Sequence, residues 1–131
     1  MEGMKASLKD FFILYHSKEM VSGDFYWFSK VQHGTKDKFL VAAIDCTGHG
    51  VPGALMSMTG AMLLNHVVKE NGIVEVDEIL KELHLGVANL LNAKESNVQD
   101  GMDIALCRID RTNQVMDFAG AKQPLIYIKN G

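Results

Sequence analysis

The stretch from Phe39 to Leu55 reads FLVAAIDCTGHGVPGAL and decides the fold. Its first six residues are apolar, as in a strand that is covered on both faces inside a layered structure. Asp45 ends this strand, and a glycine-rich turn leads to Pro52, whose fixed φ suits the first turn of a helix. The stretch therefore predicts a buried strand that leads into a helix, with a carboxylate where the strand ends.

The flanking sequence predicts more strands and a second helix. Aromatic and β-branched residues indicate strands at 11–15 and 20–31, with a turn at 32–36 before the central strand at 39–44. The first helix should end at Asn71-Gly72, and Asp77 suits the N-cap of a second helix. Later strands are predicted at 102–109, 114–119 and 125–129, with a turn at Thr112-Asn113. This order predicts an α+β fold of antiparallel sheets with helices packed outside them.

Apolar periodicity predicts which face of each helix is buried. The methionines in the first helix are expected to fill the core. The predicted stripe of the first helix contains Ala54, Leu55, Met58, Ala61, Met62, Asn65 and Val68. The predicted stripe of the second helix contains Ile79, Leu80, Leu83, Val87, Leu90 and Leu91.

Composition excludes several classes of protein. The 131 residues suit one domain, 1–131, and 47% hydrophobic with 22% charged residues is typical of a globular chain. A net charge of −3 leaves no basic footprint for nucleic acid. Two cysteines, Cys46 and Cys107, favour a reducing compartment, so we expect a cytoplasmic location. No uninterrupted apolar run approaches the roughly 20 residues of a membrane span, and we expect no direct membrane contact.

Three aspartates lie in or beside apolar strands, where an uncompensated carboxylate is costly. Asp24 lies in VSGDFYW, Asp45 ends the central strand, and Asp103 lies in GMDIAL. If Gly34-Thr35 forms a two-residue hairpin turn, Asp24 and Asp45 face each other with Cβ atoms about 4.5–5.5 Å apart. A divalent cation would turn this repulsion into a binding site, and carboxylate ligands favour Mg²⁺ or Mn²⁺.

Plainer interpretations exist for each of these residues. A single aspartate at a strand end also suits a turn or a helix cap. Gly48 and Gly50 fit either a metal or phosphate site or an ordinary tight turn. His49 could be a general acid or could fix the loop. Cys46 is expected to be a packing residue, because no arginine follows it as a cysteine phosphatase would need.

Three motifs resemble one enzyme family. The segments SGDFY at 22–26, DCTGHGVPGAL at 45–55 and DGMDIA at 100–105 resemble the SpoIIE-type branch of the metal-dependent protein phosphatases, the PPM or PP2C-like family. The segment FAGA at 118–121, followed by Pro124-Leu125, resembles the alanine-glycine segment of that branch. The resemblance implies an antiparallel β-sandwich flanked by helices, in α-β-β-α layers. It also implies a later Asp-Gly motif beyond Gly131, so the fold would be incomplete at the C-terminus.

The resemblance also implies roles for the aspartates. Asp45 matches the aspartate that bridges two Mn²⁺ or Mg²⁺ ions. Asp24 matches the ligand of one ion, together with the main-chain carbonyl of Cys46, and Asp103 matches the ligand of the other. In this family a metal-activated water attacks phosphoserine or phosphothreonine directly. His49 is the candidate general acid beside this site.

The implied substrate is a phosphorylated regulatory protein of the anti-anti-sigma kind, and the implied partner is an attached sensor or regulatory domain. An exposed sheet edge or apolar patch is expected where later strands belong, with a homodimer as one outcome. Two other functions fit the same sequence. One is a non-catalytic, partner-binding module of the same fold, and the other is a metal-dependent phosphohydrolase that acts on small molecules.

Overall fold

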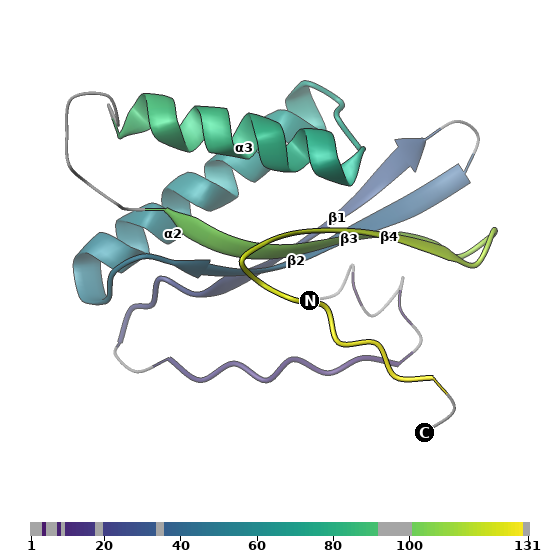
Figure 1. Ribbon diagram of the computed structural model, residues 1–131, viewed down its shortest axis with the longest axis horizontal. Coiled ribbons are helices and arrows are strands. Elements are labelled where there is room, and N and C mark those ends of the chain that lie inside the picture. The colour runs from purple at the N-terminus through teal and green to yellow at the C-terminus, as the bar shows by residue number, and fades with distance from the viewer. Residues whose placement is uncertain are drawn as a thin grey trace.

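The computed structural model describes residues 4, 8, 10–17, 20–33, 36–91 and 101–129. These residues form a four-stranded antiparallel sheet of order β1-β2-β3-β4, and two helices cover one face of it (Figure 1). This arrangement confirms the predicted α+β class. The elements in chain order are β1 (Phe25–His33), β2 (Lys36–Cys46), α2 (Gly50–Asn65), the π-helical turn η1 (His66–Glu70), α3 (Val76–Leu90), β3 (Met102–Asp110) and β4 (Val115–Ala121).

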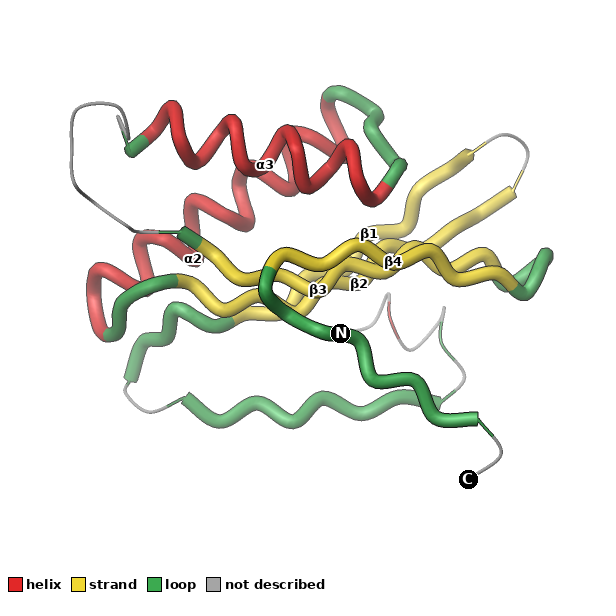
Figure 2. The backbone as a smooth tube through the Cα atoms, viewed as in Figure 1, coloured by secondary structure: helices red, strands yellow, loops and turns green. Residues whose placement is uncertain are grey.

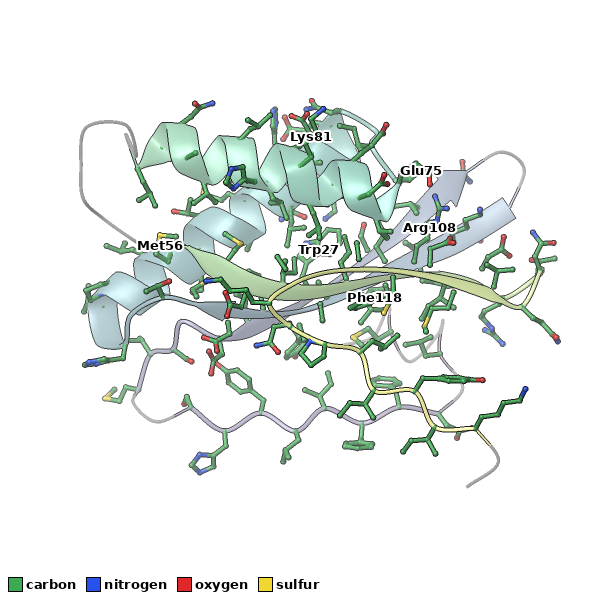
Figure 3. The ribbon with its side chains drawn as sticks, viewed as in Figure 1. Trp27, Met56, Glu75, Lys81, Arg108 and Phe118 are labelled. Atoms are coloured by element: carbon green, nitrogen blue, oxygen red, sulfur yellow. The ribbon has the colours of Figure 1, made fainter. Side chains whose placement is uncertain are left out.

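The core lies between the sheet and the helices. Leu40 of β2 and Leu106 of β3 are fully buried against Leu64 of α2 and Ile79 of α3. Trp27 of β1 points into this layer (Figure 3), and its Nε1 donates a hydrogen bond to Asn65 Oδ1 at 3.3 Å. Both helices are therefore fixed to the sheet by one continuous apolar layer.

The first hairpin has the predicted register. Phe25 pairs with Ile44 and His33 pairs with Lys36, which leaves two residues, Gly34-Thr35, for the connection. The connection itself lies outside the described residues. The predicted start of β1 at residue 20 is wrong, because the strand begins at Phe25 and residues 20–24 precede it as an irregular segment.

Two further predicted strands, at 11–15 and 125–129, are also wrong. Both segments are described, and neither forms a strand or pairs with the sheet. They run as extended chain on the side of the sheet away from the helices (Figure 2). Apolar composition alone predicted them, but a strand also needs a neighbour for its backbone hydrogen bonds. Their large side chains are mostly exposed: Phe12, Leu14, Ile126, Tyr127 and Ile128.

The central strand β2 is not covered on both faces as predicted. On the helix side, Leu40, Ala42 and Ile44 are at most 4% exposed, and on the opposite face Phe39 is also buried. Val41 is half-buried and Ala43 is exposed, because their side chains point to the opposite face. In the described part of the chain the four predicted layers are therefore represented by one helical layer and one sheet.

The buried face of α2 differs from the predicted one. The residues that α2 buries are Gly53, Met56, Gly60 and Leu64. Leu55, Met58 and Met62, which were expected in the core, are 61–69% exposed. The helix is apolar on all sides, so the spacing of its apolar residues could not identify the buried face. Met56, by contrast, packs towards the sheet as expected of a core methionine (Figure 3).

Helix α3 follows its predicted stripe, with Ile79, Leu83 and Val87 buried, although Leu90 is exposed. Its N-cap residue is Glu75 rather than the predicted Asp77, which lies in the first turn.

Arg108 of β3 fixes the beginning of α3. It is 8% exposed, it donates to the Glu75 carboxylate and to the Val74 carbonyl, and its Nη2 lies 2.9 Å from Asp117 Oδ2 (Figure 3). Hydrogen bonding to Glu75 raises the pKa of the guanidinium.

One helical segment, Gly50–Glu70, is long and apolar enough to cross a bilayer by length and composition, with a hydropathy of 1.3. Polar residues interrupt its apolar runs, which is why those runs are short in the sequence. Its Leu64, Val67 and Val68 are buried in the core. Packing on the sheet accounts for the apolar residues of this face, whereas Leu55, Met58 and Met62 on the other side are exposed.

Candidate functional site

Three predicted aspartates lie side by side across three strands. Asp24 directly precedes β1, and the β1–β2 register places it opposite Asp45. Asp45 is in turn the register partner of Asp103 in β3. Ile44 and Cys46, which flank Asp45, are buried on the helix side, so the Asp45 side chain points to the opposite face. We call Asp24, Asp45 and Asp103 the aspartate row.

The first two members of the aspartate row interact directly. The carboxyl groups of Asp24 and Asp45 lie within hydrogen-bonding reach of each other. Desolvation, together with this hydrogen bond and the charge of Asp24, raises the pKa of Asp45. Two carboxylates in contact favour a proton or a cation between them. The pair therefore has the chemistry of a site for a hard divalent cation.

Asp103 has a different neighbour. Its Oδ1 lies 3.8 Å from Lys122 Nζ, and its side chain is 39% exposed. Among the described residues, no group of three or more His, Cys, Asp or Glu side chains is compact enough to hold a metal ion. The structure thus brings the three predicted ligands into one row and places only Asp24 and Asp45 in contact.

Asp24 is held through its backbone. Its N–H donates to Ser22 Oγ at 3.0 Å, and its carbonyl accepts a hydrogen bond from the Tyr15 hydroxyl at 3.1 Å. Sequence reasoning missed Tyr15, because the residue was assigned to a strand that does not exist. The extended N-terminal segment therefore contacts the aspartate row.

Thr47 joins β2 to the beginning of β3. Its N–H and its hydroxyl both donate to the Gly101 carbonyl, at 2.9 and 3.0 Å, and its Oγ1 accepts from the Gly101 N–H at 2.9 Å. These bonds continue the β2–β3 ladder one step past Cys46. They hold Asp103 at the level of Asp45. Sequence reasoning missed this role, because Thr47 lies between two more conspicuous motif residues.

The glycines around the turn allow backbones to meet. A Cβ on Gly23 would lie 2.8 Å from the Cys46 carbonyl oxygen, and a Cβ on Gly53 would lie 2.6 Å from that of Gly48. Gly48 and Gly50 have φ angles of 95° and 62°, which favour glycine. A tight turn therefore accounts for the conformation of Gly48 and Gly50. That they bind a metal or phosphate stays a prediction.

The two other motif residues differ in environment. Cys46 is 2% exposed, and burial raises the pKa of its thiol to about 11, so the residue packs as expected and is not an activated nucleophile. Its carbonyl faces Gly23 at the end of the β1–β2 ladder. His49 is exposed and immediately precedes α2 without a side-chain cap hydrogen bond. Its function as a general acid stays a prediction.

Comparison with known proteins shows which fold this chain shares. No family model and no curated protein matches the chain. Among solved structures it is similar to the SiaA-PP2C domain of Pseudomonas aeruginosa, with a TM-score of 0.76 and 33% sequence identity. The chain has the fold of part of a PP2C domain. The similarity covers 92% of this chain but 46% of the other, so this chain spans less than half of that protein's length. It supports the metal-dependent protein phosphatase family and does not distinguish the SpoIIE-type branch.

A cavity of about 420 Å³ adjoins the aspartate row in this PP2C-like part. It lies between α3 and the first residues of β3, and Thr47, Asp103 and Lys122 contribute to its lining. The remaining wall is mostly apolar and includes Leu80, Leu83, Val87 and Ile104. The cavity thus lies on the helix side of the sheet, whereas the Asp45 side chain points to the opposite face.

Proposed function

We propose that the chain is part of a phosphoserine/phosphothreonine protein phosphatase of the SpoIIE-type branch of the PPM family. The aspartate row carries the proposal: Asp24 contacts Asp45, and Asp45 is the register partner of Asp103. Partners in a ladder share a face of the sheet, so the three carboxylates lie in one row on the same face, with Asp24 and Asp45 in contact. The similarity to the SiaA-PP2C domain supports the PPM-type fold in this proposal, and the SpoIIE-type branch follows from the motif resemblance.

In this proposal Asp45 would be a ligand of two divalent cations, Mn²⁺ or Mg²⁺. Asp24 and the Cys46 carbonyl would hold one of them, and Asp103 would hold the other. Divalent cations supply the nucleophile at neutral pH by lowering the pKa of water, and they stabilise charge on the leaving oxygen. The chain's own contribution is to keep these oxygens in place through the Thr47–Gly101 contacts and the hydrogen bonds to the Asp24 backbone. His49 is proposed to protonate the leaving oxygen.

The proposed substrate is a phosphorylated regulatory protein in the cytoplasm, and the proposed regulator is an attached sensor domain. Both follow from the motif resemblance. The exposed apolar side chains at 12, 14 and 126–128 would suit further chain or a second copy on that face of the sheet.

The decisive experiment measures Mn²⁺-dependent release of phosphate from a phosphoserine peptide and from p-nitrophenyl phosphate. Asp45→Asn should abolish the release, because it removes the central carboxylate. Asp37→Asn is the matched control, since Asp37 lies on the same strand at its far end. Loss of activity in both variants, or in neither, would contradict the assignment. Release from nucleotides but not from phosphoproteins would support the small-molecule phosphohydrolase instead.

A non-catalytic module of the same fold is the second candidate. It is favoured by the lack of a compact three-ligand group among the described residues. A calorimetric titration with Mn²⁺ separates the two functions. A phosphatase should bind Mn²⁺ and lose that binding in Asp45→Asn, whereas a module that acts only through partners should show no binding in either protein.

A further inference from the structure

Lys122 has an unusual backbone conformation beside the aspartate row. Its φ angle is 59°, in the left-handed region, which is strained for a residue other than glycine. The residue directly follows β4 and forms an isolated parallel bridge with Ile104, one residue after Asp103. The bridge ties the backbone of Lys122 to the beginning of β3. Such a conformation persists only where the surrounding structure enforces it.

The turn before Lys122 explains how the conformation is enforced. A Cβ on Gly120 would lie 2.5 Å from the Gln123 carbonyl oxygen and 2.8 Å from the ring of Phe118. The chain therefore closes tightly from residue 120 to residue 123. This closure fixes the direction in which Lys122 leaves the sheet, so its position does not depend on its ammonium group.

The ion pair with Asp103 is too weak to offset the strained backbone conformation of Lys122. Lys122 Nζ lies 3.8 Å from Asp103 Oδ1, and the lysine side chain is 83% exposed. Solvent-exposed pairs of this kind contribute little to stability, less than the strained backbone of Lys122 costs. The ammonium group can therefore leave Asp103 for a stronger anion at little cost. Because the lysine side chain is mostly exposed, an anion can reach the ammonium group from solvent.

We propose that Lys122 is a substrate-binding residue whose ammonium group donates a hydrogen bond to a non-bridging oxygen of the substrate phosphate. The inference rests on the proposed phosphatase function and adds to it a cationic group from this chain. A phosphate monoester is a dianion near neutral pH, and three carboxylates alone would repel it. A lysine held 3.8 Å from one of them supplies a positive charge at the edge of the row.

The test titrates inorganic phosphate into the Mn²⁺-loaded full chain by calorimetry. Lys122→Met keeps the length of the side chain and removes its charge, and we expect phosphate to bind about tenfold more weakly or worse, as for a lost charge-assisted hydrogen bond. Lys122→Arg should restore most of the affinity. Lys81→Met is the matched control, because Lys81 is an exposed lysine on the outer side of α3 (Figure 3). It should bind phosphate like the unchanged protein.

Steady-state kinetics gives the second measurement. Lys122→Met should raise KM for the phosphoserine peptide and the inhibition constant of phosphate together. If Lys122 only neutralises Asp103, the variant will instead bind Mn²⁺ more tightly and phosphate equally well, and the inference is wrong. An unchanged protein that binds phosphate through Lys122 but hydrolyses no phosphoester would overturn the proposed function while leaving the binding site intact.

Discussion

Replacing Gly53 with alanine tests the tight backbone crossing beside the aspartate row. Gly53 lies in the first turn of α2, where alanine normally gains about 1 kcal/mol over glycine. Its new Cβ would lie 2.6 Å from the carbonyl oxygen and 3.0 Å from the carbonyl carbon of Gly48, and 3.3 Å from Gly23 Cα. All three are backbone atoms, which cannot rotate away. The Gly48 carbonyl would have to move from 2.6 Å to at least 3.4 Å, a shift of about 0.8 Å, to reach ordinary contact.

A shift of this size in a packed turn corresponds to overpacking, which costs about 1–3 kcal/mol. Gly60 is the matched control in the same helix. A Cβ there would meet Met102 Cε at 3.0 Å and Phe25 Cζ at 3.2 Å, and the end of a methionine side chain can move. Set against the roughly 1 kcal/mol that alanine gains in a helix, this overpacking cost leaves Gly53→Ala less stable by up to about 2 kcal/mol. Gly60→Ala should stay within about 1 kcal/mol of the unchanged protein and should be the more stable of the two variants.

Urea denaturation monitored by tryptophan fluorescence measures both variants. The chain has one tryptophan, Trp27, which is 7% exposed between the sheet and the helices, so its emission reports loss of the core. Gly53→Ala should also bind Mn²⁺ more weakly, because the turn after Asp45 must move. If Gly53→Ala proves as stable as Gly60→Ala, the close approach of Gly53 to Gly48 is not a constraint on this fold.

Three further outcomes are expected. Asp45→Asn should raise the Tm of the metal-free protein in EDTA, because it removes the like-charge contact with Asp24. A lower Tm would contradict this. Added Mn²⁺ should stabilise only the unchanged protein. Arg108→Met should lower the free energy of unfolding, measured in urea, by about 1.5–3 kcal/mol, since the carboxylates of Glu75 and Asp117 lose a charged donor. An unchanged midpoint of the urea transition would refute the stabilising role of Arg108. Burial raises the pKa of the Cys46 thiol from an ordinary 9.0 to about 11, so the folded state favours the neutral thiol. The free energy of unfolding should therefore fall as the pH rises from 9 to 11. In the comparison variant Cys46→Ala it should fall less over this range.

The helices show where sequence periodicity is sufficient and where it is not. In α3, charged residues alternate with apolar ones, so Ile79, Leu83 and Val87 could be identified as the buried face. Helix α2 contains no charged residue, and its buried face is set by what approaches it. Gly53 and Gly60 lie on that face because the turn and β1 come close. A pattern of apolar residues cannot reveal this, since glycine gives no apolar signal.

The strands show a related limit. The central strands were predicted from their β-branched and apolar residues. In the structure β2 and β3 also have a partner strand on each side. The segments at 11–15 and 125–129 have similar composition, yet both lie outside the sheet. Their backbone pairing depends on what lies beside them, and composition contains no such information. Tyr15 nevertheless reaches Asp24 from one of these segments, so the contact survives although the predicted element does not.

Chain geometry explains why the Asp24–Asp45 pair could be predicted from sequence and the Asp45–Asp103 pair could not. Asp24 and Asp45 belong to a hairpin, and a two-residue turn determines their register from sequence positions alone. Asp103 reaches Asp45 only after two helices and the segment 92–100, and no short turn sets that register. The structure supplies Thr47 for this purpose: its hydrogen bonds to Gly101 fix the first step of the β2–β3 ladder, from which Asp103 follows two residues later. The long-range half of the site thus depends on a threonine that was not among the predicted ligands.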